Sequence, residues 1–261
     1  MDYGLRERVV LITGGARGIG FEAARLFAAE GAKLALADIN GAAADAAARR
    51  LIDLGAKVIG IGADITSGAQ CAEMLARVED ALGPLSVVVN SAAVLDDKTF
   101  LESSPADWKR IVNVCLYGAM NVLHTTLPGM VERKFGRVVC MASDSAKLGQ
   151  ARLSYYAAAK AGVIALVKSV AQEVGGAGVT LNVVSPGATN TELRQEREAG
   201  LRASMGEEKY ARRVNSVLKM YPTGRIGEPN DIANAILFLS SASAGWVTGQ
   251  VLSVNGGFTM T

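Results

Sequence analysis

The sequence predicts an α/β fold in which helices cover both faces of one parallel, doubly wound sheet. Three observations support this prediction. Short apolar runs alternate with helical patterns along the chain, a glycine-rich turn follows the first run, and an aspartate ends the second. Short continuous apolar runs are typical of parallel strands, because both faces of such a sheet are covered. No repeat, low-complexity tract or linker divides the sequence, so we expect one domain over residues 1–261.

The expected elements follow in order along the chain. Strands are expected at residues 9–12, 34–37, 58–61, 87–90, 137–141, 179–184 and 251–254. Helices are expected at residues 21–28, 42–54, 69–82, 105–132, 154–174 and 231–239.

Residues 191–221 interrupt this alternation. The segment is long, charged and helix-prone, and it follows a proline-glycine turn at a strand end. Ligands of open α/β sheets bind beyond the carboxyl ends of the strands. We therefore expect a substrate lid here, with a surface elaboration that lacks a function as the alternative.

The first strand leads into a turn rich in glycine, Thr13-Gly14-Gly15-Ala16-Arg17-Gly18-Ile19-Gly20. Strand, glycine turn and helix are the context that a dinucleotide-binding fingerprint requires. The glycines permit a tight turn and let the backbone approach a pyrophosphate, and the helix N-terminus offers free N–H groups. The spacing is G-x-x-x-G-x-G instead of the strict G-x-G-x-x-G. The turn predicts a Rossmann-type nucleotide site, with an ordinary strand-to-helix loop as the alternative.

Asp38 ends the second strand, about 20 residues beyond the turn. An acid at this point accepts hydrogen bonds from the adenosine ribose hydroxyls and repels a 2′-phosphate, which favours NAD over NADP. Arg17 argues in the other direction, because a cation in the glycine turn could meet that phosphate. We give Asp38 more weight, because it would face the phosphate directly.

Tyr156 and Lys160 are four residues apart, and Ser143 precedes Tyr156 by thirteen residues. Residues i and i+4 share a helix face, so Lys160 can lie beside the Tyr156 ring and lower the pKa of the phenol. A tyrosine tuned in this way can exchange a proton with an alcohol or a ketone. Ser143 follows an expected strand, where its hydroxyl can hold the reacting oxygen. The Tyr-x-x-x-Lys pattern alone is common on exposed helices. The separate prediction of a nucleotide site favours a catalytic role for this pattern.

Composition excludes several other classes of function. The formal charge of +2 is too balanced to suggest nucleic acid or an anionic membrane surface as a partner. A single histidine, His124, excludes histidine-based triads and multi-histidine metal sites, and no metal-ligand cluster stands out. No stretch has the layout of a signal peptide or of a membrane span, and Cys71, Cys115 and Cys140 have no paired spacing. We expect a cytoplasmic protein with a small-molecule substrate.

Together these motifs resemble the short-chain dehydrogenase/reductase family over essentially the whole chain. The matching residues are Thr13-Gly14-x-x-x-Gly18-x-Gly20, Asp64, Asn90-Ser91-Ala92-Ala93, Ser143, Tyr156-x-x-x-Lys160, Asn182-x-x-x-Pro186-Gly187, Gly224 to Pro229, Thr248-Gly249-Gln250 and Asn255-Gly256-Gly257.

The resemblance implies a role for each matching position. Tyr156 would be the acid/base, Lys160 would bind the nicotinamide ribose, and Ser143 would position the substrate oxygen. The cofactor would be contacted by Gly14, Arg17, Gly18, Ile19, Gly20 and Asp38, with Asp64 and Ile65 beside the adenine, Asn90 and Ala92 along the cleft, and Pro186, Gly187, Thr189 and Thr191 around the nicotinamide. The resemblance also implies a homotetramer.

One departure from the family pattern concerns catalysis. The family carries a fourth catalytic residue, an asparagine seven positions after a helix tryptophan, and counting from Trp108 this position is Cys115. Asn113 is two residues away, on another helix face. The family asparagine supports a water in a proton relay to the lysine, so Cys115 puts this relay in doubt, although its backbone carbonyl could still hold the water.

The expected activity is NAD-dependent interconversion of a secondary alcohol and a ketone on a cyclic or acyl-CoA-type substrate. Residues 127–133 and 142–144 resemble the 2-hydroxycyclohexanecarboxyl-CoA dehydrogenases within the family. Alternatives are a 3-oxoacyl-thioester reductase and a non-catalytic nucleotide-sensing protein of the same fold. Basic residues of the expected lid could meet a carboxylate or a CoA phosphate, or they could form solvated i,i+4 pairs.

Overall fold

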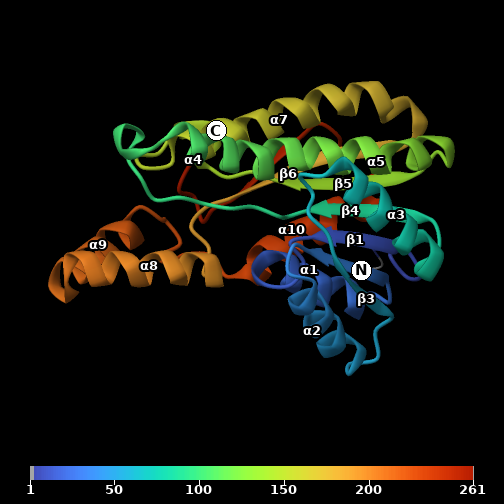
Figure 1. Cartoon of the computed structure of the whole chain (residues 1–261), viewed down its shortest axis with the longest axis horizontal. Helices are drawn as coiled ribbons and strands as arrows, with labels where there is room; N and C mark the ends of the chain where they lie inside the picture. The colour runs from blue at the N-terminus through green and yellow to red at the C-terminus, as the bar shows by residue number, and fades with distance from the viewer. Residues whose placement is uncertain (1–2, 261) are drawn as a thin grey trace.

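The computed structural model describes residues 3–260, so residues 1, 2 and 261 of the expected domain lie outside the described part. Its centre is a seven-stranded sheet in the order β3-β2-β1-β4-β5-β6-β7, and every pairing is parallel (Figure 1). The strands are β1 Val9–Thr13, β2 Lys33–Asp38, β3 Val58–Gly62, β4 Leu85–Asn90, β5 Gly136–Met141, β6 Val179–Pro186 and β7 Val251–Val254.

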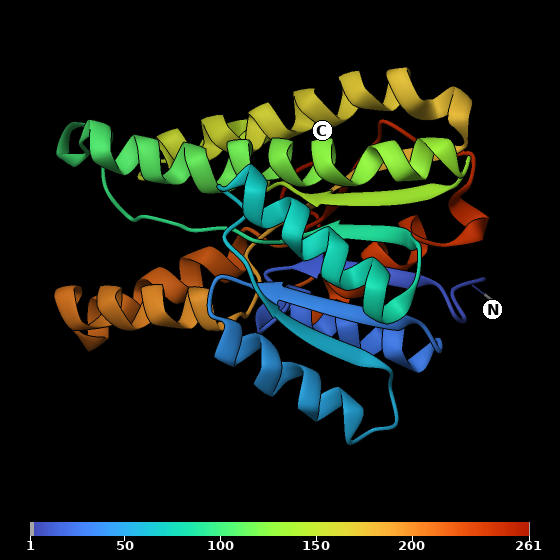
Figure 2. The same ribbon diagram turned by 45° about the vertical axis from the view of Figure 1, so that its right-hand side comes forward.

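Helices cover both faces of this sheet (Figure 2). One face carries α1 (Gly18–Ala29), α2 (Gly41–Ile52) and α10 (Pro229–Leu239), and the other carries α3 (Gly68–Leu82), α4 (Pro105–Val112), α5 (Gly118–Glu132) and α7 (Ser154–Val174). Alternate residues of β1 feed the two cores, since Leu11 packs into one apolar cluster while Val10 and Ile12 pack into the other. The predicted doubly wound α/β fold is confirmed.

The strand order reverses next to β1, which pairs with β2 on one side and with β4 on the other. Thr13, the last residue of β1, lies opposite Ala37 and Asn90 in the two neighbouring strands. Its hydroxyl donates a 2.7 Å hydrogen bond to Oδ1 of Asn90. In open α/β sheets the crevice at such a reversal is where ligands bind.

The segment that the sequence marked as irregular forms two helices, α8 (Glu192–Met205) and α9 (Glu207–Lys219). They project together from the body of the molecule beyond the carboxyl ends of the strands (Figure 1). Gly206 separates them with a φ of 78°, a left-handed backbone that favours glycine. We call residues 191–221 the α8–α9 segment.

The expected helix over residues 105–132 differs in its middle. The structure has α4, then a π-helical turn η2 (Asn113–Tyr117), then α5, and the N–H of Gly118 donates to the carbonyl of Asn113. A π turn takes in one extra residue, which hydrophobic periodicity does not reveal. Short helices were also not expected, among them η1 (Phe100–Glu102) and α6 (Ser145–Leu148).

No helix within residues 3–260 is long and apolar enough to cross a membrane. The longest, α7, has 21 residues and includes charged side chains such as Lys160 and Lys168.

Close packing of α2 on β3 requires glycine at position 60. A Cβ at Gly60 would lie 2.7 Å from the backbone N and Cα of Asp45 in α2. We expect Gly60→Ala to lower the free energy of unfolding by about 1–3 kcal/mol, the usual cost of overpacking. Urea denaturation measures this loss. The control is Gly200→Ala in α8, where a Cβ meets nothing within 4 Å, and alanine should raise stability by roughly 0.5–1 kcal/mol. Equal stability of Gly60→Ala and the wild type would contradict the packing argument.

Candidate active site

A cavity of about 480 Å³ lies at the carboxyl ends of the strands, beneath the α8–α9 segment. It is lined by most of the residues that the sequence predicted: Gly14, Arg17, Gly18, Ile19, Asp38, Asp64, Ile65, Ala92, Ser143, Tyr156, Lys160, Pro186, Gly187, Thr189 and Thr191. Gly20, Asn90 and Cys115 do not line it.

The glycine turn at one end of the cavity is sterically constrained. Gly14 has a φ of 65°, and a Cβ there would lie 2.8 Å from the backbone of Ala92. Gly18 has a φ of 57° at the start of α1. Gly20 packs against the back of the turn. A side chain at this position would clash with the turn, because a Cβ on Gly20 would lie 2.2 Å from the carbonyl oxygen of Gly14. This backbone cradle and the helix N-terminus behind it fit a pyrophosphate.

Asp38 and Arg17 differ in how free they are to meet a ligand. Asp38 lines the cavity, and its Oδ1 accepts a 3.1 Å hydrogen bond from the N–H of Asn40. The guanidinium of Arg17 lies 2.5 Å from Oε1 of Glu196 in α8. Arg17 is therefore already paired with the α8–α9 segment.

Asn90 and Ala92 support the wall of the cavity in different ways. Asn90 is buried and accepts the hydrogen bond of Thr13, whose hydroxyl also accepts a 3.4 Å hydrogen bond from the N–H of Ala92. Asn90 thus holds the loop that follows β4, while Ala92 reaches the cavity itself.

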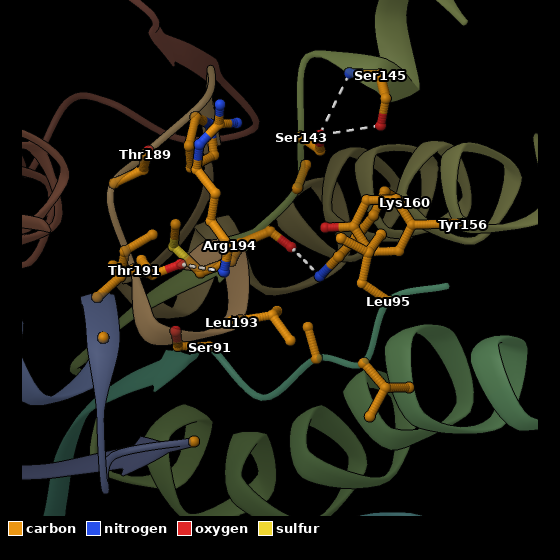
Figure 3. A pocket seen from close by; sticks show the side chains of 18 of the residues that line it. Ser91, Leu95, Ser143, Ser145, Tyr156, Lys160, Thr189, Thr191, Leu193 and Arg194 are labelled. Carbon is orange, nitrogen blue, oxygen red and sulfur yellow. Dashed lines mark hydrogen bonds between the residues drawn. The ribbon is translucent and has the colours of Figure 1, made fainter. Parts of the chain in front are cut away.

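Ser143, Tyr156 and Lys160 meet at the other end of the cavity (Figure 3). Lys160 is 2% exposed, and its Nζ donates a 2.7 Å hydrogen bond to the carbonyl of Met141 at the end of β5. The same Nζ lies 5.8 Å from the centroid of the Tyr156 ring. The two residues share one face of α7, as their spacing predicted.

The expected lowering of the Tyr156 pKa is wrong for this structure. Burial raises the pKa of Tyr156 above its ordinary value, the neighbouring Cys115 adds to this rise, and a hydrogen bond with Ser143 acts in the opposite direction. The ammonium of Lys160 points to the Met141 carbonyl, so it does not offset the desolvation of the phenol. Tyr156 is therefore held as a neutral phenol, the form that can donate a proton.

Two residues beside Ser143 were not predicted. Ser145 donates to Oγ of Ser143 through its hydroxyl at 2.9 Å and through its backbone N–H at 3.3 Å. Asp144 is 2% exposed, and its carboxylate accepts hydrogen bonds from Ser185 and Asn255. A Ser-Asp-Ser sequence after a strand carries no signal for the contacts of Asp144, which depend on residues far away in the chain, or for the local turn that brings Ser145 onto Ser143.

Cys115 lies in the π turn, close to Tyr156 but behind the cavity wall. It is 2% exposed, and its Sγ donates to the carbonyl of Val94 at 3.5 Å. It belongs to a small apolar cluster with Ile111 and Tyr155, against which Tyr156 packs. The position seven residues after Trp108 thus lies near Tyr156, with its thiol directed at a backbone carbonyl.

The remaining wall of the cavity, near Ser143 and Tyr156, is largely apolar. It includes Val94, Leu95, Leu153, Val217, Met220, Tyr221 and Phe258. Tyr221 and Phe258 stack with ring centroids 5.2 Å apart. The hydroxyl of Tyr221 accepts a 2.9 Å hydrogen bond from the N–H of Ala188, which fixes this apolar wall beside the end of β6.

Three arginines of the α8–α9 segment also line the cavity, and each already has an acidic partner. Arg194 and Arg213 lie 3.2 Å and 2.7 Å from the carboxylate of the buried Glu198. Arg197 lies 2.5 Å from Asp97. Elsewhere in the segment Arg212 pairs with Glu208 in the i,i+4 arrangement. Three arginines thus face the cavity and at the same time form ion pairs with acidic residues of the protein: Arg194, Arg197 and Arg213.

Asp97 joins three parts of the chain. It lies in the loop after β4 and contacts Arg197 of α8 and Arg152, which precedes α7. Arg152 has a φ of 68°, an unusual value for a residue other than glycine, and its guanidinium also donates to the carbonyl of Asp97 at 2.9 Å. Partial burial alone would raise the pKa of Asp97, but the hydrogen bonds from Arg152 and Arg197 outweigh it and hold that pKa below its usual value.

Comparison with known proteins agrees with this geometry. A family model described as Enoyl-(Acyl carrier protein) reductase matches residues 14–259. The acetoacetyl-CoA reductase of Shinella zoogloeoides is 37% identical over 251 residues, which cover 96% of this chain and 98% of the relative. The (2S)-[(R)-hydroxy(phenyl)methyl]succinyl-CoA dehydrogenase subunit BbsD of Thauera aromatica is 38% identical over 254 residues, 97% of either chain. The 3-oxoacyl-[acyl-carrier-protein] reductase FabG of Vibrio cholerae serotype O1 is 34% identical over 257 residues, 98% of this chain and 99% of the relative.

The protein belongs to the short-chain dehydrogenase/reductase family, because the family model and these relatives match nearly the whole chain. The glycine turn, the parallel sheet and the cavity with Ser143, Tyr156 and Lys160 agree with this assignment. It is an oxidoreductase of the ketoreductase type, and its family uses nicotinamide cofactors.

The environment of Cys115 allows a direct test of its position. An asparagine there could donate from Nδ2 to the carbonyl of Val94, as the thiol now does. We expect Cys115→Asn to reduce a ketone at a rate equal to or above that of the wild type, measured as kcat at saturating cofactor. Cys115→Ala is the matched variant, because it removes the thiol without adding an amide. A large loss in Cys115→Asn with none in Cys115→Ala would show that the site is built around a small residue.

Proposed function

We propose that the protein is an NAD-dependent dehydrogenase/reductase that interconverts a secondary alcohol and a ketone on an acyl-CoA-type or other acyl-thioester substrate. The observation that carries this proposal is the convergence of Ser143, Tyr156 and Lys160 on one cavity whose opposite end holds the glycine turn and Asp38.

In this proposal Tyr156 is the acid/base. Its raised pKa keeps it protonated, so in reduction it can give its proton to the ketone oxygen and become a phenolate. Oxidation is the reverse step, in which the Tyr156 phenolate takes the proton of the alcohol. Ser143 donates a hydrogen bond to the same oxygen. Lys160, held by the Met141 carbonyl, would bind the cofactor ribose. The nicotinamide cofactor supplies or accepts the hydride.

The cofactor site is proposed to extend from the glycine turn to the end of β6. Gly14, Gly18 and Ile19 would receive the pyrophosphate, Asp64 and Ile65 the adenine, and Pro186, Gly187, Thr189 and Thr191 the nicotinamide; all of them line the cavity. Gly20 and Asn90 would hold this wall from behind. We propose NAD because Asp38 faces the cavity while the competing cation, Arg17, is paired with Glu196.

Three observations support a thioester with an apolar acyl group as the substrate. The relatives named above act on acyl-CoA or acyl-carrier-protein substrates. The wall formed by Leu95, Leu153, Tyr221 and Phe258 suits a hydrocarbon chain or a ring. The cavity also carries Arg194, Arg197 and Arg213, whose guanidinium groups are of the kind that binds a CoA phosphate or a carboxylate. We propose that the α8–α9 segment is the lid over this substrate, and a 2-hydroxycycloalkanecarboxyl-CoA is the specific candidate.

We further propose a homotetramer in the cytoplasm. Apolar side chains are exposed on two surfaces that a second copy of the chain could cover: Tyr117, Met120 and Val131 along η2 and α5, and Trp246, Leu252 and Met260 near β7. Cys71, Cys115 and Cys140 are free and buried, which suits a reducing compartment.

The role of Tyr156 can be tested against its neighbour. We expect Tyr156→Phe to lower kcat by about 10²–10⁴-fold while the dissociation constant for NAD stays nearly unchanged, because only the transferable proton is lost. Steady-state kinetics measure kcat, and isothermal titration calorimetry with NAD measures the dissociation constant. The control is Tyr155→Phe, since the Tyr155 hydroxyl donates to Asp96 outside the reacting group. Retention of more than a few per cent of activity in Tyr156→Phe would refute the acid/base assignment.

Cofactor choice can be tested at Asp38. We expect kcat/KM with NAD to exceed kcat/KM with NADP, and Asp38→Ala to narrow the ratio by about tenfold, because one close charge repulsion is removed. Asp53→Ala, an exposed acid after α2, should leave the ratio unchanged. Equal wild-type efficiency with the two cofactors would mean that Arg17 outweighs Asp38 despite its pairing with Glu196.

The substrate class can be tested by comparing 2-hydroxycyclohexanecarboxyl-CoA with cyclohexanol. We expect kcat/KM for the thioester to be at least about tenfold higher, because the arginines and the length of the cavity act only on the thioester. If cyclohexanol is oxidised as efficiently, the arginines form only internal pairs, and a plain cyclic alcohol is the better substrate.

A further inference from the structure

The hydrogen bonds of the Ser143 hydroxyl are set by the residue two positions later. Ser145 is 4% exposed and begins α6. Its backbone N–H and its hydroxyl both donate to Oγ of Ser143, at 3.3 Å and 2.9 Å. A serine hydroxyl has two acceptor positions and one proton. Since Ser145 fills both acceptor positions, the proton of Ser143 is left to point elsewhere.

Ser143 and Tyr156 line the same cavity (Figure 3). The side chain of Ser143 acts to lower the pKa of the Tyr156 phenol, so the two hydroxyl groups lie near each other. A substrate oxygen that binds between the two residues would therefore meet a Ser143 hydroxyl that already points its proton at it.

The backbone that carries both serines is anchored by Asp144. Its Oδ1 accepts a 2.9 Å hydrogen bond from Ser185 of β6, and its Oδ2 accepts a 2.6 Å hydrogen bond from Asn255 after β7. Its N–H donates to the carbonyl of Pro186 at 3.1 Å. Hydrogen bonds to a carboxylate are among the stronger ones in proteins. Asp144 thus fixes the Ser143–Ser145 loop to the ends of two strands.

We propose that Ser145 is a positioning residue that holds Ser143 as a hydrogen-bond donor toward the substrate oxygen, with Asp144 as the anchor of the loop. This inference rests on the proposed function, in which Ser143 contacts that oxygen. A pre-oriented donor contributes to turnover more than to binding of the thioester, because most of the substrate lies elsewhere in the cavity.

The test is a double-mutant cycle in the full-length protein, with acetoacetyl-CoA and NADH as probes. We expect Ser145→Ala to lower kcat by about tenfold, the effect of one oriented hydrogen bond, with KM changed less than about twofold. Ser145→Thr keeps the hydroxyl and should retain most of the activity. In a Ser143→Ala background, Ser145→Ala should cause no further loss, because Ser145 acts only through Ser143.

The matched control is Ser241→Ala. Ser241 is also buried and donates one side-chain hydrogen bond, at 2.7 Å to the carbonyl of Phe238, but it does not line the cavity. A thermal melt of each variant measures general loss of stability, which should be similar for Ser145→Ala and Ser241→Ala. Only Ser145→Ala should change kcat.

Three results would overturn the inference. An unchanged or higher kcat in Ser145→Ala would show that Ser143 donates to Ser145, and an additive loss in the double variant would show that Ser145 acts independently of Ser143. A crystal structure of Ser145→Ala tests the inference without a measurement of activity. We expect the Ser143 hydroxyl to leave its position beside Tyr156. If the hydroxyl has not moved, its position does not depend on Ser145. A Ser143→Ala variant as active as the wild type would instead refute the proposed function.

Discussion

The arrangement of the whole molecule depends on one constraint, the common direction of all seven strands. Because every pairing is parallel, every strand ends at the same edge of the sheet, and the loops after β1, β2, β4, β5 and β6 must gather there. Residues as distant in sequence as Gly14, Ser143 and Gly187 therefore line one cavity. The helices on either face bury the apolar surface, which leaves this edge free to carry polar and strained groups.

Elements defined by strong local patterns were predictable from the sequence. The helix with Tyr156 and Lys160 begins at Ser154 and ends at Val174, as its pattern predicted, and all seven strands lie where apolar runs placed them. The π turn at Asn113–Tyr117 was not predictable, because it depends on how α4 and α5 pack and not on a change of periodicity. The comparison of Asn113 and Cys115 by helix faces assumed a regular α-helix, and this assumption does not apply within the turn.

The residues of the site also divide into those that a local sequence pattern predicts and those that depend on the folded structure. Residues with a sequence signature, such as Gly14, Gly18, Asp38 and the Tyr-Lys pair, lie on the cavity as expected. Ser145 has its partner in Ser143, and Asp144 has partners on β6 and after β7, so only the folded chain reveals these contacts. The pKa of Tyr156 could not be predicted from spacing either. Spacing places Lys160 near the ring, but the direction of its Nζ and the burial of the phenol are tertiary properties.

Asp97 makes α8 and the start of α7 parts of one charge system. Its carboxylate is shared between Arg197 of α8 and Arg152, two residues before α7 begins. Because Arg152 and Arg197 share one carboxylate, their contacts with Asp97 are coupled. By thermodynamic reciprocity, the Arg197 contact changes the free energy of the Arg152 contact by the same amount as the Arg152 contact changes that of the Arg197 contact. The loop after β4 thus links the position of α8 to the start of the helix that carries Tyr156.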